Sequence, residues 1–206
     1  MIFHRFILGS FVTNCYLVAD KDTKNAILFD APADADKILD YLKKNDLTLK
    51  KVFLTHSHFD HILALQEVID ATKAELFLHK DEEKYLKNPE LNLVAEHCDK
   101  LNTPESYQLL SDGDELPLDS INIKVIHTPG HTQGSTCYFV NDILISGDTL
   151  FAGSIGRTDF PLGSFDNIIN SIKTKLMLLD DETKVYPGHG FSTTIGKQRK
   201  ENPFLI

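Results

Sequence analysis

The amino-terminal third of the chain consists of short apolar runs separated by turn-prone polar residues. This pattern predicts strands over residues 2–8, 15–19 and 25–30, arranged as a meander. From Ala33 the apolar positions follow helical spacing, which predicts a helix before a strand at residues 52–54. A further helix from His61 then precedes a strand at residues 75–78.

The remaining part of the chain repeats this alternation of helix and strand. Residues 80–107 are polar and irregular, and only loose helical turns are predicted there. Strands are predicted at residues 121–126, 135–140, 142–146 and 184–186, a helix at 165–179, and a short last segment after residue 196. No repeat and no Gly, Ser or Pro linker divides the chain, so we expect one α/β or α+β domain over residues 1–206, with helices covering sheets.

Composition and charge narrow the class of partner. The 206 residues are 42% hydrophobic, enough for one substantial core. A net charge of −9 without any Lys or Arg cluster argues against nucleic acid. The start lacks a basic leader, apolar runs are too short to span a bilayer, and the three cysteines show no CxxC pattern. We therefore expect a cytoplasmic protein that binds a small molecule and neither nucleic acid nor membrane.

The densest polar motif is THSHFDH at residues 55–61, directly after an apolar strand. With nine histidines in the chain, this order arises by composition about once in a thousand chains. His56 and His58 alternate at the strand end and point together, whereas Asp60 and His61 turn toward a second point nearby. Imidazoles and carboxylates at this density suit Zn(II), Fe(II) or Mn(II), and the lack of thiolate favours a catalytic over a structural site.

Three further motifs each follow an apolar strand and lift a ligand-type side chain to a strand end, where loops of one sheet edge converge. They are HTPGHTQGS at 127–135, SGDT at 146–149 and YPGHG at 186–190, with side chains His131, Asp148 and His189. Taken singly, each also fits an ordinary turn. Together with THSHFDH, they predict a two-metal site.

The order HxHxDH, distant His, Asp and Gly-His-Gly resembles the metallo-β-lactamase superfamily over nearly the whole chain. LFAGSIGRTDFP at residues 150–161 and the ending GHGFSTTIGKQRKENPFL look like the short bacterial glyoxalase II-like proteins. Those are hydroxyacylglutathione hydrolases, which cleave thioesters such as S-lactoylglutathione. The resemblance implies a four-layer αββα sandwich with metals at the top edge of the sheets, and no carboxy-terminal helical domain of the kind found in longer glyoxalase II enzymes.

The resemblance also assigns metal ligands at seven positions that match the family in type and order. Three hold one metal, three hold the other and one bridges: His56, His58 and His131; Asp60, His61 and His189; and Asp148. Two divalent ions are implied, zinc first, with iron or manganese as alternatives. Asp30 matches an acid that supports the metal loops, although it also fits a strand-terminal turn. Arg157 is the candidate cation for a substrate carboxylate, or for bracing its loop through Asp159.

The reaction expected from these residues is thioester hydrolysis by a hydroxide held between the metals, with Asp60 and Asp148 as catalytic-site carboxylates. Two divalent cations, two carboxylates and a hydroxide leave roughly one positive charge, so bound water is deprotonated near neutral pH. A thiol of pKa about 8.5 leaves as thiolate without a general acid, whereas an amide nitrogen needs one. The motifs hold no clear general acid, which favours thioesters over lactams and peptides.

Three other functions are open at the level of sequence. Persulfide dioxygenases resemble this fold, share a GRTDF-like segment and hold one Fe(II) with two His and an Asp. A β-lactamase is disfavoured by GSIGRTDFP and the short tail. A non-catalytic metal-stabilised binding module is disfavoured because a closed structural site uses fewer ligands.

Overall fold

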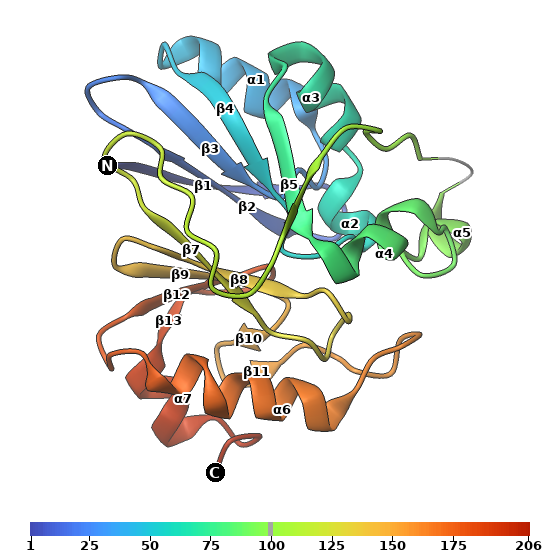
Figure 1. Ribbon diagram of the computed structural model, residues 1–206, viewed down its shortest axis with the longest axis vertical. Coiled ribbons are helices and arrows are strands. Elements are labelled where there is room, and N and C mark those ends of the chain that lie inside the picture. The colour runs from blue at the N-terminus through green and yellow to red at the C-terminus, as the bar shows by residue number, and fades with distance from the viewer. Residues whose placement is uncertain (99–100) are drawn as a thin grey trace.

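Two β-sheets face each other and carry helices on their outer faces (Figure 1). The computed structural model describes residues 1–98 and 101–206. From top to bottom of Figure 1, the layers are a helical layer, a six-stranded sheet, a five-stranded sheet and a second helical layer. This is the four-layer αββα sandwich implied by the resemblance, which confirms the predicted fold class.

The first sheet contains the amino-terminal half of the chain. Its strands, in spatial order, are β1 (Ile2–Leu8), β2 (Thr13–Ala19), β3 (Asn25–Phe29), β4 (Thr48–Phe53), β5 (Glu75–His79) and β6 (Gln108–Leu110). The first three are antiparallel, as the meander predicted, and β3 to β6 are parallel. Helices α1 (Ala35–Lys44) and α3 (Leu65–Thr72) lie in the crossovers from β3 to β4 and from β4 to β5, and cover the outer face.

The second sheet contains the carboxy-terminal half. Its strands, in spatial order, are β13 (Thr193–Thr194), β12 (Lys184–Pro187), β9 (Ile143–Gly147), β8 (Thr136–Val140) and β7 (Ile123–His127). Helices α6 (Phe165–Thr174) and α7 (Ile195–Glu201) and the 3₁₀ turn η2 (Leu176–Leu178) pack on its outer face. Asn141 has a φ of 53° in the tight turn between β8 and β9.

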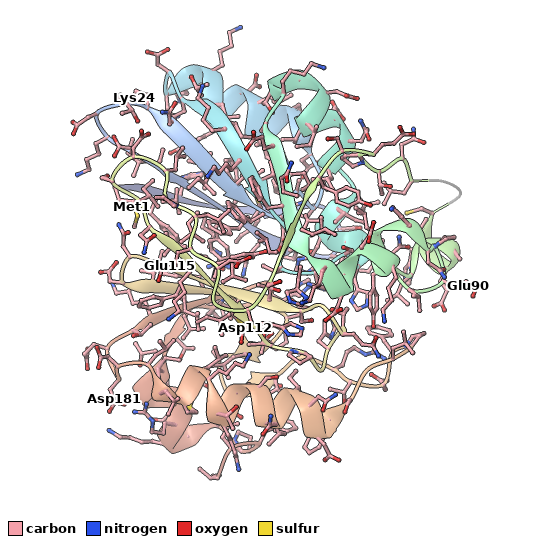
Figure 2. The ribbon with its side chains drawn as sticks, viewed as in Figure 1. Met1, Lys24, Glu90, Asp112, Glu115 and Asp181 are labelled. Carbon is pink, nitrogen blue, oxygen red and sulfur yellow. The ribbon has the colours of Figure 1, made fainter. Side chains whose placement is uncertain are left out.

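Side-chain alternation along the strands separates the core into layers. In β2, Cys15 and Leu17 face the helical layer, whereas Tyr16 and Val18 face the second sheet. The strand is buried on both faces, which explains why its sequence is apolar throughout. Side chains from both sheets fill the space between them (Figure 2).

The structure differs from the predicted elements at several points, among them β13, which was not predicted, and the helix predicted over residues 165–179, which is α6 followed by η2. The helix expected from His61 is two helices, α2 (Phe59–Ile62) and α3. Strand β6 and the small hairpin of β10 (Leu150–Phe151) and β11 (Ser154–Ile155) were not predicted, because runs of two or three residues carry little periodicity.

The stretch at residues 80–107 holds three short helical segments: η1 (Lys80–Glu82), α4 (Glu83–Lys87) and α5 (Val94–His97). The loose helical turns predicted there are thus confirmed for its described residues, and residues 99–100 lie outside them. Over the described parts of the chain, every helix is too short or too polar to cross a lipid bilayer.

Candidate metal centre

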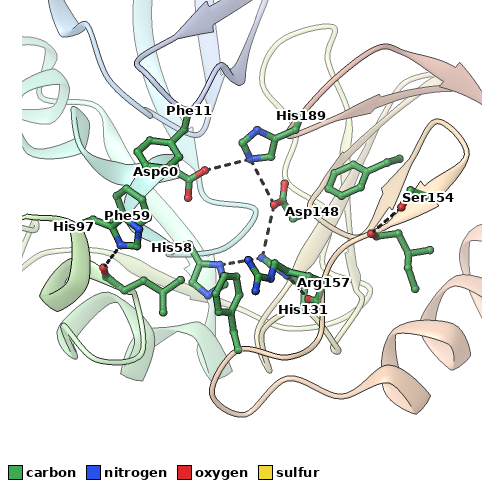
Figure 3. A pocket seen from close by; sticks show the side chains of 14 residues that line it. Phe11, His58, Phe59, Asp60, His97, His131, Asp148, Ser154, Arg157 and His189 are labelled. Atoms are coloured by element: carbon green, nitrogen blue, oxygen red, sulfur yellow. Dashed lines mark hydrogen bonds and ion pairs between the residues drawn. The ribbon is translucent and has the colours of Figure 1, made fainter.

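The seven predicted ligand residues come together at one edge of the sandwich, where loops from both sheets meet. Figure 3 shows those that line the cavity: His58, Asp60, His131, Asp148 and His189. The loop after β4 carries the THSHFDH residues. The loops after β7, β9 and β12 supply His131, Asp148 and His189 respectively. Four strand ends separated by up to 133 positions in the chain, from residue 56 to residue 189, therefore build one cluster.

The first half of the cluster is a group of three buried imidazoles. The Nε2 atom of His131 lies 2.9 Å from Nδ1 of His58 and 3.2 Å from Nε2 of His56. Three ring nitrogens thus converge on one small volume, and each of the three residues is no more than 2% exposed. Nδ1 of His131 donates to the carbonyl oxygen of Arg157 at 2.7 Å, which leaves Nε2 as its inward-facing acceptor.

The second half combines two imidazoles with two carboxylates. His189 Nε2 lies 3.2 Å from Oδ2 of Asp60 and 3.6 Å from Oδ2 of Asp148. His61 Nε2 lies 3.4 Å from Oδ1 of Asp148, and His131 Nε2 lies 3.7 Å from its Oδ2. Asp148 therefore stands between the two halves, with one oxygen toward His61 and the other toward His131 and His189.

The donor set fits divalent metal ions. His61 Nε2 and Asp148 Oδ1 are both buried and have no hydrogen-bond partner among the residues that the structure describes, although burying such atoms unpaired is costly. The subsets His56–His58–His131, His56–His61–Asp148 and Asp60–His61–His189 each bring three ligand atoms within 4.8 Å of one another. Imidazole nitrogen and carboxylate oxygen without thiolate are suited to zinc, iron and manganese.

Electrostatics keep the imidazoles of the first half in the form that can bind a metal. Burial, reinforced by neighbouring imidazoles, lowers the pKa of His56 and His58 well below the ordinary value, so both rings are neutral. Burial alone would raise the pKa of Asp148, but His61 and His189 hold it below its usual range. The three-histidine half thus presents neutral nitrogens beside the ionised carboxylate of Asp148.

The carboxylate of Asp30 holds the THSHFDH loop through hydrogen bonds. Its Oδ1 accepts from the backbone N–H of Thr55, and its Oδ2 accepts from the Thr55 hydroxyl, each at 2.8 Å. Oδ2 also lies 2.8 Å from Nδ1 of His61. Asp30 directly follows β3, with a φ of 61°, and is 2% exposed. It is therefore both a turn residue and a hydrogen-bonding partner of the loop, which combines the two sequence interpretations.

Gly188 leaves room for the cluster. A Cβ atom at this position would overlap Oδ1 of Asp148 and the ring of His61. The YPGHG motif therefore needs glycine here because the loop backbone lies directly against two site residues.

A cavity of about 450 Å³ opens over the cluster and has a largely aromatic wall. Phe59 packs edge-to-face with Phe11, with ring centroids 4.8 Å apart, and stacks on His97 at 4.2 Å. Phe151 and Phe160 also line the cavity, whereas Tyr186 packs between the sheets.

Nothing in the sequence separates Phe151 and Phe160 from core aromatic residues, or His97 from a packing or surface histidine. Their spacing carries no periodic signal that separates a pocket wall from a core. Phe11 lies in a turn, and nothing near it in the sequence marks it as a site residue.

Arg157 reaches the cavity rim from the loop after β11. Its guanidinium forms two hydrogen bonds to Asp159, at 2.8 and 2.7 Å, and stacks over Phe160 with 4.0 Å between the guanidinium carbon and the ring centroid. This is the internal pair expected from GRTDF. The same side chain lines the cavity, so it is also within reach of a bound molecule.

Comparisons with known proteins agree with the fold and the motifs. The model of the metallo-beta-lactamase superfamily matches residues 8–189. The hydroxyacylglutathione hydrolase GloC of Haemophilus influenzae is 35% identical, over 95% of this chain and 94% of its own length. The probable metallo-hydrolase YqgX of Bacillus subtilis is also 35% identical, over 100% and 98%. The chain belongs to the metallo-β-lactamase superfamily, whose members are generally metal-dependent hydrolases.

Three solved structures are similar to this chain over nearly its whole length. BLEG-1, described as a B3 metallo-beta-lactamase, is 37% identical with a TM-score of 0.93, covering 100% of both chains. TTHA1623, solved in a di-iron-bound form, is 31% identical with a TM-score of 0.88, over 98% of this chain and 100% of its own. ETHE1 from Myxococcus xanthus is 31% identical with a TM-score of 0.84, over 98% and 84%.

Proposed function

We propose that the protein is a binuclear metal-dependent thioesterase that hydrolyses S-lactoylglutathione or a related hydroxyacyl thioester. The observation that carries this proposal is the position of Asp148 between two groups of ligand-type side chains. A bridging carboxylate of this kind serves two metal ions rather than one. The likeness to GloC supports a hydroxyacyl thioester as substrate.

The proposed ligands are those assigned by the motifs: three histidines on one side, Asp60, His61 and His189 on the other, and Asp148 between them. Two zinc ions held there would lower the pKa of bound water and polarise a thioester carbonyl. The protein fixes the ligand rings from behind, through Asp30 on His61 and the Arg157 carbonyl on His131. Asp60 is held by a hydrogen bond of 3.3 Å from the Thr13 hydroxyl.

The cavity suits a thioester that places its reacting carbonyl over the cluster and its apolar part along Phe11 and Phe59. A thiol with a pKa of about 8.5 leaves as the thiolate and needs no protonation. The reaction therefore needs no proton donor on the leaving-group side. We propose that the Arg157 guanidinium releases Asp159 and pairs with a carboxylate of the bound substrate instead.

The test is steady-state hydrolysis of S-lactoylglutathione by protein stripped with chelator and reloaded with zinc, manganese or iron. Metal-dependent loss of the thioester is the expected result, and His58→Ala and Asp148→Ala should abolish it in a folded chain. Because BLEG-1 is described as a β-lactamase, a chromogenic β-lactam belongs in the same assay. β-Lactam turnover without thioester turnover would overturn the proposal.

The likeness to ETHE1 adds one further arm to this test. Iron-loaded protein is mixed with glutathione persulfide, and oxygen consumption is followed with an electrode. Oxygen uptake without thioester hydrolysis would place the chain among the dioxygenases and overturn the thioesterase proposal. Absence of oxygen uptake alongside thioester turnover supports it.

A further inference from the structure

Glu82 is a buried carboxyl that has no part in the proposed ligand set. It ends the turn η1 after β5, and is 1% exposed. Oε1 accepts from the backbone N–H of Ser57 at 2.7 Å, and Oε2 accepts from the hydroxyl of Thr132 at 2.7 Å. Each oxygen of one carboxylate is thus used by a different loop.

Both loops carry members of the three-histidine group. Ser57 lies between His56 and His58, and Thr132 follows His131. The first loop extends from the six-stranded sheet and the second from the five-stranded sheet. The Glu82 carboxylate therefore links the two loops at the point where nitrogens of His58 and His131 approach to 2.9 Å.

The packing around Glu82 holds this link in one geometry. A Cβ atom at Gly134 would overlap the Glu82 side chain and backbone, so the His131 loop lies directly on it. Thr132 is itself tied to Ser135 by its backbone N–H at 2.9 Å and its hydroxyl at 2.8 Å. Burial raises the pKa of Glu82 to about 7 against the hydrogen bonds from Thr132 and Ser57. A carboxyl in such a place is costly unless its hydrogen bonds are made.

We propose that Glu82 is a positioning residue that sets the spacing of His58 and His131 by joining their two loops. It acts on the three-histidine half of the centre, whereas Asp30 acts on the half that contains His61. The inference rests on the three-histidine group binding a metal, which is part of the proposed function. It does not depend on the identity of the substrate.

The experiment measures metal affinity at each half separately. His189→Ala leaves the three-histidine group intact, and His58→Ala leaves the group of Asp60, His61 and His189 intact. Glu82→Gln is placed in each background, and zinc is titrated against a chromogenic chelator. Glu83→Gln is the matched control, because this neighbour is partly exposed and its carboxylate accepts from Lys87 and Tyr107 rather than from the metal loops.

In Glu82→Gln, one carboxylate oxygen becomes an NH₂ group that faces a donor, so one of the two loops loses its acceptor. We expect zinc affinity to fall roughly 10–100-fold in the His189→Ala background, and by less than about threefold in the His58→Ala background. The visible spectrum of Co(II) bound to the three-histidine group should change as well. Glu83→Gln should leave both affinities unchanged.

Two results would overturn the proposal. One is an equal loss in both backgrounds, which would make Glu82 a general stability residue. The other is no loss in either, with the variant folded and the Co(II) spectrum unchanged. If Glu82→Gln does not fold, Thr132→Val is used in its place, because it removes the hydroxyl that contacts Glu82 and Ser135 but keeps the backbone hydrogen bond to Ser135. The same selective loss is then expected, and the same two results count against the proposal.

Discussion

Oδ2 of Asp30 lies 2.8 Å from Nδ1 of His61, so the ring has one tautomer and its Nε2 atom faces the cluster. In Asp30→Asn, the amide cannot accept from both Thr55 and His61 as the carboxylate does. We expect zinc affinity to fall roughly 10–100-fold, chiefly for the second equivalent. Metal analysis after dialysis measures the stoichiometry. Asp36→Asn, in the first turn of α1, is the control, and two retained zinc ions in Asp30→Asn would contradict the expectation.

Gly188→Ala tests how tightly the loop after β12 packs on the cluster. The added methyl group overlaps Asp148 and His61, so the loop must move away from the site. We expect at least about a 100-fold loss of hydrolysis, as small displacements of catalytic groups commonly cause. Gly190→Ala is the control, since its φ is 76° and no atom lies within 4 Å of the added methyl. It carries backbone strain alone and should retain most of the activity.

Phe11→Ala should weaken substrate binding without slowing the chemical step. Phe11 lines the cavity on the aromatic wall, where its ring contacts Phe59 and His97 and not the proposed ligands. Loss of its ring contact predicts a KM increase of roughly 5–20-fold with kcat nearly constant. Ile7→Ala, an exposed residue of the preceding strand, is the control. A fall in kcat at unchanged KM would show that Phe11 acts on the reaction itself.

Arg157→Gln separates the two roles open to this side chain. If Arg157 meets a substrate carboxylate, KM rises roughly tenfold for a thioester that carries one and stays constant for an uncharged thioester. Asp159→Asn frees the guanidinium and should lower KM for the charged substrate. Equal kinetics for both substrates, with loss of thermal stability, would assign Arg157 to bracing its loop.

His79 predicts a dependence of stability on pH that is separate from the metal centre. Burial, followed by the neighbouring His127, lowers its pKa from 6.5 to about 4. Between these values the unfolded chain binds a proton that the folded chain does not, so stability is full above pH 6.5 and is lost as the pH falls toward 4. Near pH 5 the loss is about 2 kcal/mol.

Urea unfolding of chelator-treated protein at pH 7 and pH 5 measures this contribution. His79→Asn should be less stable at pH 7, because the stack on His127 at 3.8 Å is lost, but its stability should change less between the two values. Comparing the two proteins cancels the other titrating groups. An identical pH dependence in both would contradict the prediction.

The clustering of these ligand-type side chains could be predicted from the sequence because metal binding demands particular residue types at strand ends. Each of these side chains follows a strand that is recognisable in the sequence as an apolar run; they belong to THSHFDH or are His131, Asp148 and His189. The same local logic found most helices and strands. The four-layer arrangement came from family resemblance, since periodicity does not fix which strands pair across 100 residues.

The residues of the cavity wall and the buried Glu82 could not be found in this way. Phe11 and His97 reach the cavity through contacts between a hairpin turn and a short helix, which leave no periodic trace. Glu82 stands in the run KDEE, where charge predicts an exposed helix start, and only the tertiary packing buries it. Long-range hydrogen bonds of this kind are set by topology rather than by the neighbouring residues.

Because the centre is divided between the two sheets, a bound metal ion would connect the two halves of the sandwich. His58 belongs to one half of the sandwich, and His131 and His189 to the other. Ions held between them oppose separation of the halves, so loading should raise the unfolding temperature in proportion to the logarithm of free metal concentration. In the unfolded chain these residues are far apart, so its affinity for the metal is lower.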